Sequence, residues 1–214
     1  ELGYRVIEAA LSQLKQWQDE HGISARVGVN LSARQFEDER MYERLEALLS
    51  RSGVDPSAVV LELTEGSVMR DPPRAIAGMK RLRRTGLRFA LDDFGSGYSA
   101  FSYLNRLPID ILKIDRSFVV RATASVGDEK TLRTLVALAH DLGMRVVVEG
   151  VETGEQVSLL RSIGDVRMQG FFVARPMPGD EIPRWAEEME RGAPFAGGAA
   201  GNTPAADGAG QRRG

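Results

Sequence analysis

One arrangement repeats from the start of the sequence to about residue 190, and it restricts the fold more than any other feature. An amphipathic stretch ends at a glycine, a short apolar run rich in β-branched residues follows, and that run stops at a polar or charged residue. Helices that alternate with strands in this way predict a parallel sheet covered on both faces. Left-handed helix ends are expected at five glycines: Gly22, Gly53, Gly86, Gly143 and Gly164.

The expected strands are the apolar runs, which cover residues 25–32, 58–64, 87–92, 109–115, 144–149 and 166–173. A helix over residues 2–18 precedes them, and a short helical segment over 101–106 lies before the fourth run. Capping-box spacing and proline positions predict where helices begin. These signals are Ser32 with Gln35, Thr153 with Gln156, Asp71 before Pro72 and Pro73, and Asp180 before the last amphipathic helix.

Six strand–helix units with a leading helix fall short of a closed eightfold barrel, which needs roughly 250 residues. We therefore expect an α/β fold of the (β/α)8 TIM-like barrel type, incomplete at the N-terminus, with at least one strand upstream. A doubly wound open sheet is the alternative, but the glycine fingerprint expected after its first strand is absent. The barrel domain is expected over residues 1–191, and the Gly- and Ala-rich residues 192–214 are expected to be a disordered tail.

Composition excludes several classes of function. With 43% hydrophobic and 27% charged residues, the chain is ordinary for a soluble globular protein. A net charge of −2 gives no polybasic surface, so we expect no DNA or RNA partner. No apolar run is long enough for a membrane segment. The absence of cysteine excludes disulfides and thiol nucleophiles and fits a cytoplasmic location.

Polar or ionisable side chains stand at or near the carboxyl ends of the expected strands. A carboxylate among valines and leucines costs several kcal/mol unless it has a partner. A single strand-end carboxylate is most simply a helix cap or a loop hydrogen bond, but repetition on five successive strands argues against that interpretation. In a parallel barrel these ends meet on one face, where active sites lie. The residues are Asn30, Glu62, Asp92, Asp93, Lys113, Glu149 and Gln169.

The charge of this set predicts a metal site. Glu62, Asp92, Asp93 and Glu149 are four carboxylates, and Lys113 offsets only one of them. Ligands that are all oxygen favour Mg²⁺ or Mn²⁺ over zinc. Adjacent Asp92 and Asp93 can serve two ions, and two metals about 3.5–4 Å apart are typical of phosphodiester hydrolysis.

Lys113 has two interpretations. Some barrel enzymes place a Schiff-base lysine on a strand, but that chemistry needs a lowered pKa, and neighbouring carboxylates raise it instead. We therefore favour a charged lysine that orients the attacking water or the phosphate. The loop that follows the aspartates contains the tripeptide DFG of protein kinases, yet no other kinase motif accompanies it.

Six segments resemble the successive signatures of EAL-domain cyclic di-GMP phosphodiesterases, in family order from Leu2 to about Met189. They are VNLS, ELTEG, DDFGSGYS, LPIDILKIDRSF, VVVEGVET and QGFFVARPMP. A single segment such as DDFG is weakly specific, whereas six in order are highly specific. The resemblance implies a barrel close to the (β/α)8 type with one antiparallel strand. It also implies hydrolysis of cyclic di-GMP to linear pGpG with Mg²⁺ or Mn²⁺.

The same resemblance implies roles for the strand-end residues. Asn30, Glu62 and Asp92 would bind the first metal ion, and Asp92 would bridge to a second ion held with Asp93 and Glu149. Lys113 would hold or activate the hydrolytic water, so that Lys113, Glu149 and Asp93 form the catalytic set.

Other positions are expected to bind the substrate or to support a loop. Gln169 would line the substrate site. Glu65 and Glu152 would steady the loop that contains Phe94, Gly95, Ser96 and Gly97. In the family this loop also links the site to dimerisation, so a homodimer is expected here.

The sequence departs from the family pattern in two respects. The Glu-Ala-Leu strand, with its metal-binding Glu, is expected just upstream of Leu2, and Ser96 stands where Thr is common. A catalytically impaired EAL domain that acts as a cyclic di-GMP receptor or protein-interaction module is therefore the alternative function, and a fragment that does not fold alone is a third. A sensor or cyclase-like domain is expected upstream in the parent protein.

Overall fold

The computed structural model describes residues 2–95, 101–192 and 195. Its centre is a sheet of six strands, all parallel, in the order β1-β2-β3-β4-β5-β6. This is the parallel α/β arrangement that the alternating pattern predicts. The strands are β1 (Val27–Asn30), β2 (Val59–Thr64), β3 (Arg88–Phe94), β4 (Ile111–Ile114), β5 (Arg145–Val148) and β6 (Val166–Met168).

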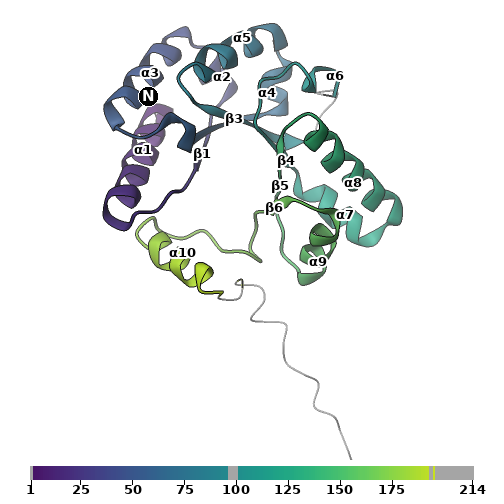
Figure 1. Cartoon of the computed structure of the whole chain (residues 1–214). Coiled ribbons are helices and arrows are strands. Elements are labelled where there is room, and N and C mark those ends of the chain that lie inside the picture. The colour runs from purple at the N-terminus through teal and green to yellow at the C-terminus, as the bar shows by residue number, and fades with distance from the viewer. Residues whose placement is uncertain (1, 96–100, 193–194, 196–214) are drawn as a thin grey trace, which may run out of the picture.

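The helices lie outside the curved sheet, as Figure 1 shows. None of those in the described part of the chain is both long and apolar enough to span a membrane. They are α1 (Leu2–His21), α2 (Ala33–Phe36), α3 (Glu39–Ser52), η1 (Pro56–Ala58), α4 (Glu65–Met69), α5 (Pro72–Arg83), α6 (Phe101–Leu104), α7 (Arg116–Ala124), α8 (Val126–Asp141), α9 (Gly154–Ile163) and α10 (Ile182–Glu190).

The sheet forms an arc. Within the described residues β1 pairs with β2 alone and β6 with β5 alone. The indole Nε1 of Trp17 in α1 donates a hydrogen bond of 2.8 Å to the carbonyl oxygen of Gly179, which lies shortly before α10. The first helix and the segment leading into the last one are therefore held together. The predicted tail, residues 192–214, falls almost entirely outside the described residues.

Most of the residues that the sequence marks as helix ends or helix caps have those positions in the structure. The five glycines expected to end helices all have positive φ, between 64° and 134°. The capping boxes at Ser32 and Thr153 both form, and Asp71 caps α5 ahead of its prolines. Gly164 ends α9, but its ψ of −143° lies outside the left-handed helical region that was expected. The other predictions in this set are confirmed.

Two local predictions are wrong. The last strand ends at Met168 rather than at residue 173, because the chain turns after Gly170 and the N–H of Val173 donates to the Gly170 carbonyl. Asp180 does not cap α10: its cap residue is Glu181, whose side chain makes no capping hydrogen bond. Pro183 in the first turn has no N–H for a capping side chain to bind.

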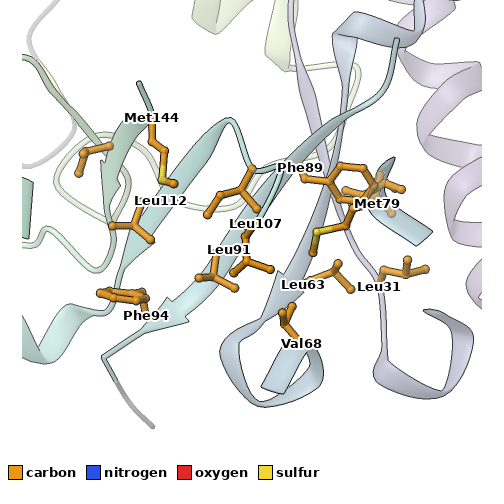
Figure 2. Close-up of a cluster of buried hydrophobic side chains, with 14 of the residues drawn as sticks. Leu31, Leu63, Val68, Met79, Phe89, Leu91, Phe94, Leu107, Leu112 and Met144 are labelled. Atoms are coloured by element: carbon orange, nitrogen blue, oxygen red, sulfur yellow. The ribbon is translucent and has the colours of Figure 1, made fainter. Parts of the chain in front are cut away.

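The hydrophobic core lies between the sheet and its helices (Figure 2). Alternate strand residues point into it, because successive side chains on a strand face opposite sides. The other strand residues face the inside of the arc, which we call the inner face. Core residues on the helix side include Leu61, Leu63, Phe89, Leu91, Leu112 and Ile114, each at most 1% exposed.

Candidate active site

The inner face carries a layer of polar side chains at the carboxyl ends of the strands. Asn30 and Glu62 are register partners across β1 and β2. The N–H of Gln169, after β6, donates to the carbonyl oxygen of Val148, the residue before Glu149. The predicted residues Asn30 and Gln169 therefore flank the layer on its two sides, and both are exposed.

Lys113 on β4 is the centre of this layer. Its Nζ lies 2.6 Å from Glu62 Oε2, 2.9 Å from Asp92 Oδ1 and 2.8 Å from Glu149 Oε1. The side chain is almost fully buried, with 5% of the residue exposed. One ammonium group thus contacts carboxylates from the ends of three other strands, and the structure brings together four of the residues that the strand-end pattern singled out.

Asp92 and Asp93 reach the same site because the end of β3 is irregular. Neighbouring strand residues normally point to opposite faces. Here the pairing of β3 with β4 shifts register between Leu91 and Phe94, and Asp93 adopts a left-handed backbone with φ of 55°. Among described residues other than glycine, Asp93 alone has positive φ, a conformation that costs energy and is typical of functional sites.

The ionisation of the site follows from burial and from its charges. Burial lowers the pKa of Lys113, but hydrogen bonds to Glu149 and Glu62 raise it by more, so the pKa lies above its ordinary value. Burial raises the pKa of Glu149 despite the opposing effect of Lys113. Burial, followed by the charges of Asp92 and Asp115, raises the pKa of Asp93. Lys113 therefore stays protonated, which argues against a Schiff-base nucleophile.

The site fits a hard divalent cation. One carboxylate oxygen from each of Asp92, Asp93 and Glu149 lies within 4.8 Å of the others. Asp92 Oδ1 is buried, and no group among the described residues completes a hydrogen bond to it, although Lys113 is nearby. Burial is the main cause that raises the pKa of Asp93 and Glu149, and a bound cation would offset this cost of burying their charges. Oxygen ligands of this kind suit Mg²⁺ or Mn²⁺.

The predicted loop supports differ in what they contact. Glu65, at the start of α4, is 3% exposed, and its Oε2 accepts a hydrogen bond of 3.0 Å from the N–H of Gly95. Phe94 is buried beside it, whereas Ser96 and Gly97 lie outside the described residues. Glu65 therefore holds the first glycine of the predicted loop.

Glu152 contacts a residue that sequence reasoning did not single out. Its carboxylate pairs with both terminal nitrogens of Arg116, at 2.9 and 3.0 Å. The stem of Arg116 packs over Gly150, where an added Cβ would lie 2.5 Å from Arg116 Cγ, and Gly150 has φ of 62°. Arg116, the first residue of α7, thus joins this helix to the segment that carries Glu149.

Gly28 on β1 is a second residue that sequence reasoning missed. An added Cβ at this position would lie 2.1 Å from Glu62 Oε1, so glycine leaves the space that the Glu62 side chain occupies. A glycine inside a strand often marks such a close approach, and its place between two valines in VGVN was the available signal.

Comparisons with known proteins agree with this geometry. The sequence matches the family model of the EAL domain over residues 1–176. It is 36% identical over 182 residues to the Pseudomonas aeruginosa protein named bifunctional diguanylate cyclase/cyclic di-GMP phosphodiesterase MucR, covering 85% of this chain and 27% of MucR. It is 35% identical over 184 residues to cyclic di-GMP phosphodiesterase PdeR of Escherichia coli, covering 86% of this chain and 28% of PdeR. The chain therefore spans about a quarter of the length of these relatives.

Solved structures show the same fold. The MucR phosphodiesterase in complex with cyclic di-GMP superimposes with a TM-score of 0.80 at 36% identity, over 85% of this chain and 73% of that one. The EAL domain of Mycobacterium smegmatis DcpA gives a TM-score of 0.82 at 34% identity, over 87% of this chain and 85% of that one. These are TIM-barrel-like (β/α)8 domains, and the six parallel strands here match them. We call the carboxylates around Lys113 (Glu62, Asp92, Asp93 and Glu149) the acidic layer. The family match and the shared fold, together with this layer, show that the chain belongs to the EAL domain family.

Proposed function

We propose that this domain is a cyclic di-GMP phosphodiesterase, which hydrolyses its substrate to linear pGpG with two Mg²⁺ or Mn²⁺ ions. The observation that carries the proposal is the convergence of Asp92, Asp93 and Glu149 around the protonated Lys113. Relatives named as cyclic di-GMP phosphodiesterases and the MucR complex with this dinucleotide support the choice of substrate.

The ligand sets follow the resemblance to the EAL family, and the cluster of three carboxylates supports the second set. We assign Asn30, Glu62 and Asp92 to one ion, and Asp92, Asp93 and Glu149 to the other. When bound, the two ions polarise the phosphodiester and lower the pKa of water, so that a strong nucleophile is available at neutral pH.

The residues of the chain position the reactants. Lys113 keeps its proton and directs its N–H groups into the carboxylate layer, where it orients the attacking water or a phosphoryl oxygen. Asp93 and Glu149 face the same space and accept hydrogen bonds from that water. Gln169, at the edge of the layer, contacts the dinucleotide. Glu65 fixes Gly95 and thereby the start of the loop beside Asp93.

Three wider features belong to the same proposal. An enzyme that degrades an intracellular second messenger would act in the cytoplasm. We also retain the homodimer and the upstream sensor or cyclase-like module as predictions, to be tested by light scattering and by sequencing the gene upstream of Glu1.

The direct test is turnover. The domain, extended upstream to include the expected Glu-Ala-Leu strand, is incubated with cyclic di-GMP and either Mg²⁺ or Mn²⁺, and pGpG is separated by ion-exchange chromatography. The Asp93→Asn variant is expected to lose on the order of 100-fold or more in rate, since even residues that only support metal ligands contribute 10- to 100-fold. Asp141→Asn, at the exposed end of α8, is the matched control and should keep the full rate.

The outcomes separate the enzyme from the receptor. Formation of pGpG that depends on metal and on Asp93 supports the phosphodiesterase. Absence of pGpG, or equal rates in both variants, rejects it. If calorimetry then shows tight binding of cyclic di-GMP that remains intact for hours, the domain is a receptor, as the alternative interpretation states.

A further inference from the structure

The first turn of α7 lies between the segments that carry Asp93 and Glu149. This helix begins at Arg116, shortly after Lys113 on β4. Strand β4 pairs with β3 on one side and with β5 on the other. Asp93 stands near the end of β3, and Glu149 directly follows β5. A helix that begins at the end of the middle strand can therefore contact both of the segments that bear these carboxylates.

Phe118 contacts the segment after Asp93. An added Cβ at Gly95 would lie 2.3 Å from Phe118 Cε2, so the ring rests against the backbone of this glycine. The guanidinium carbon of Arg121, on the same helix, lies 4.9 Å from the centroid of the Phe118 ring and helps to fix it. Since the N–H of Gly95 donates to Glu65, Gly95 is held by α4 and by α7.

Arg116 contacts the segment after Glu149. An added Cβ at Gly150 would lie 2.5–2.7 Å from three carbons of the Arg116 side chain, so the stem of the arginine lies directly on the backbone. The guanidinium group pairs with the Glu152 carboxylate at 2.9 Å. The N–H of Glu152 donates a hydrogen bond of 2.7 Å to the side chain of Gln156, a buried residue of α9. The chain on both sides of Gly150 is thus tied to neighbouring elements.

The turn that makes these two contacts is itself fixed to β4. The carboxylate of Asp115 accepts a hydrogen bond of 3.0 Å from the N–H of Ser117, which lies between the two contact residues. Gly95 and Gly150 both have positive φ, at 90° and 62°, a conformation that favours glycine. No side chain therefore separates α7 from either segment, and any movement of this turn would be passed to both of them.

We propose that Arg116 and Phe118 are positioning residues, which set the separation of the Glu149 and Asp93 carboxylates for a divalent cation. One oxygen of each carboxylate, with one from Asp92, lies within 4.8 Å of the others. An octahedral Mg²⁺ ion holds its oxygens at about 2.1 Å, which places neighbouring ligand oxygens about 3 Å apart. Small displacements of either segment therefore weaken coordination. This inference rests on the proposed metal-dependent function and adds two residues from outside the carboxylate cluster.

The test measures manganese affinity without substrate, so its readout does not depend on turnover. The domain, extended upstream to include the expected Glu-Ala-Leu strand, is titrated with Mn²⁺ by calorimetry, and free manganese is followed by electron paramagnetic resonance. Arg116→Ala and Phe118→Leu are each expected to weaken manganese affinity about tenfold, as is typical of residues that support metal ligands. Arg116→Lys keeps the stem and the charge and should recover most of the lost affinity.

Two residues of α8 provide matched controls. Arg133 also pairs with a carboxylate, that of Glu129 at 2.8 Å, and also joins two elements, because it donates to the carbonyl oxygen of Ser162 on α9. Leu138, like Phe118, is a partly buried side chain packed against the core. Arg133→Ala and Leu138→Ala should lower the melting temperature by amounts similar to those of the α7 variants, but they should leave manganese affinity unchanged.

Each outcome decides the proposal. Parent-like affinity in both α7 variants, or an equal loss in the controls, overturns it, as does a parent that binds no manganese. If circular dichroism shows that Arg116→Ala is unfolded, Glu152→Gln removes the ion pair alone and is expected to weaken binding in the same direction. If the parent binds manganese but forms no pGpG, the phosphodiesterase is rejected, while the affinities of the variants still decide whether Arg116 and Phe118 position the carboxylates.

Discussion

At the scale of single residues, the acidic layer depends on small residues that leave it room. Gly28 borders the Glu62 carboxylate, and Gly150 lies under the stem of Arg116. Neither glycine has a functional group in its side chain. Each allows a charged neighbour to adopt the position in which its contacts are made, so the geometry of the site extends to residues without functional groups.

We predict that Gly28→Ala impairs the site without unfolding the protein. The added Cβ would meet the far end of Glu62, which can swing away at small cost, but the 2.6 Å contact with Lys113 would then be lost. Manganese affinity, measured by calorimetry, should fall several-fold, while the melting temperature changes little. Gly66→Ala is the control, since nothing lies within 4 Å of its added Cβ. Equal manganese affinity in both variants would contradict the prediction.

The chemical types at the site could be predicted from sequence, but their orientations could not. Burial makes a charged strand end conspicuous, so Glu62, Asp92, Lys113 and Glu149 stand out. Asp92 and Asp93 both face the site because the pairing of β3 shifts register beside them. No local sequence pattern predicts this shift. The pairing of Glu152 with Arg116 brings together residues 36 positions apart, and only the tertiary fold determines it.

At the scale of elements, polar side chains directly before two helices cap them, one at the end of a strand and one between two helices. Asp115, directly after β4, caps α7, because its Oδ1 accepts a hydrogen bond of 3.0 Å from the N–H of Ser117. Ser125 caps α8 in the same way through the N–H of Asp128. Caps of this kind contribute about 1 kcal/mol each.

These two caps predict different pH dependence of stability. The hydrogen bond from the Ser117 side chain is the main cause that holds the pKa of Asp115 below its ordinary value of 3.8. Its stabilisation is therefore fully present above pH 3.8 and is lost as pH falls through the lowered native pKa. Asp115→Ala should cost about 1 kcal/mol in the free energy of unfolding at pH 7, and less as pH drops below 3.8. The measurement is urea denaturation over this range.

Ser125→Ala is the matched control for this prediction. A serine hydroxyl does not titrate in this range, so the cost of its removal should stay nearly constant with pH. Parallel curves for the two variants would show that the charge of Asp115 does not contribute.

Helix boundaries were predictable wherever a backbone conformation or a cap has a chemical signature. Glycines with positive φ and the two capping boxes are examples. The end of β6 was not predictable in this way, because the apolar run through Val173 suits a strand. Gly170 instead turns the chain, and the N–H of Phe172 donates to the Val151 carbonyl.

At the scale of the whole molecule, the first and last helical segments support each other. The hydrogen bond from Trp17 to Gly179 joins residues 162 positions apart. An added Cβ at Gly179 would lie 2.5 Å from the side chain of Gln13, so α1 and this segment are in close contact. The docking of α10 therefore depends on α1.

We predict that Trp17→Phe loosens this docking. Phenylalanine keeps most of the apolar contact but lacks the N–H, which leaves the Gly179 carbonyl without its partner and costs about 1 kcal/mol. Amide hydrogen exchange in α10 should accelerate about fivefold, while exchange in α5 serves as the internal control. Unchanged rates in α10, or an equal increase in both helices, would refute the proposed link.

The parallel order of the sheet was the most predictable feature. Continuously apolar strands that alternate with helices can be buried in few other arrangements.

The left-handed backbone at Asp93 has a consequence for how this fold can diverge. Glycine and asparagine tolerate that conformation best, and neither carries a negative charge. Replacement by either one would remove a carboxylate while the strand end stayed as it is. If the domain is the phosphodiesterase proposed above, a single substitution of this kind would convert it into a receptor that retains the dinucleotide, with the fold left intact.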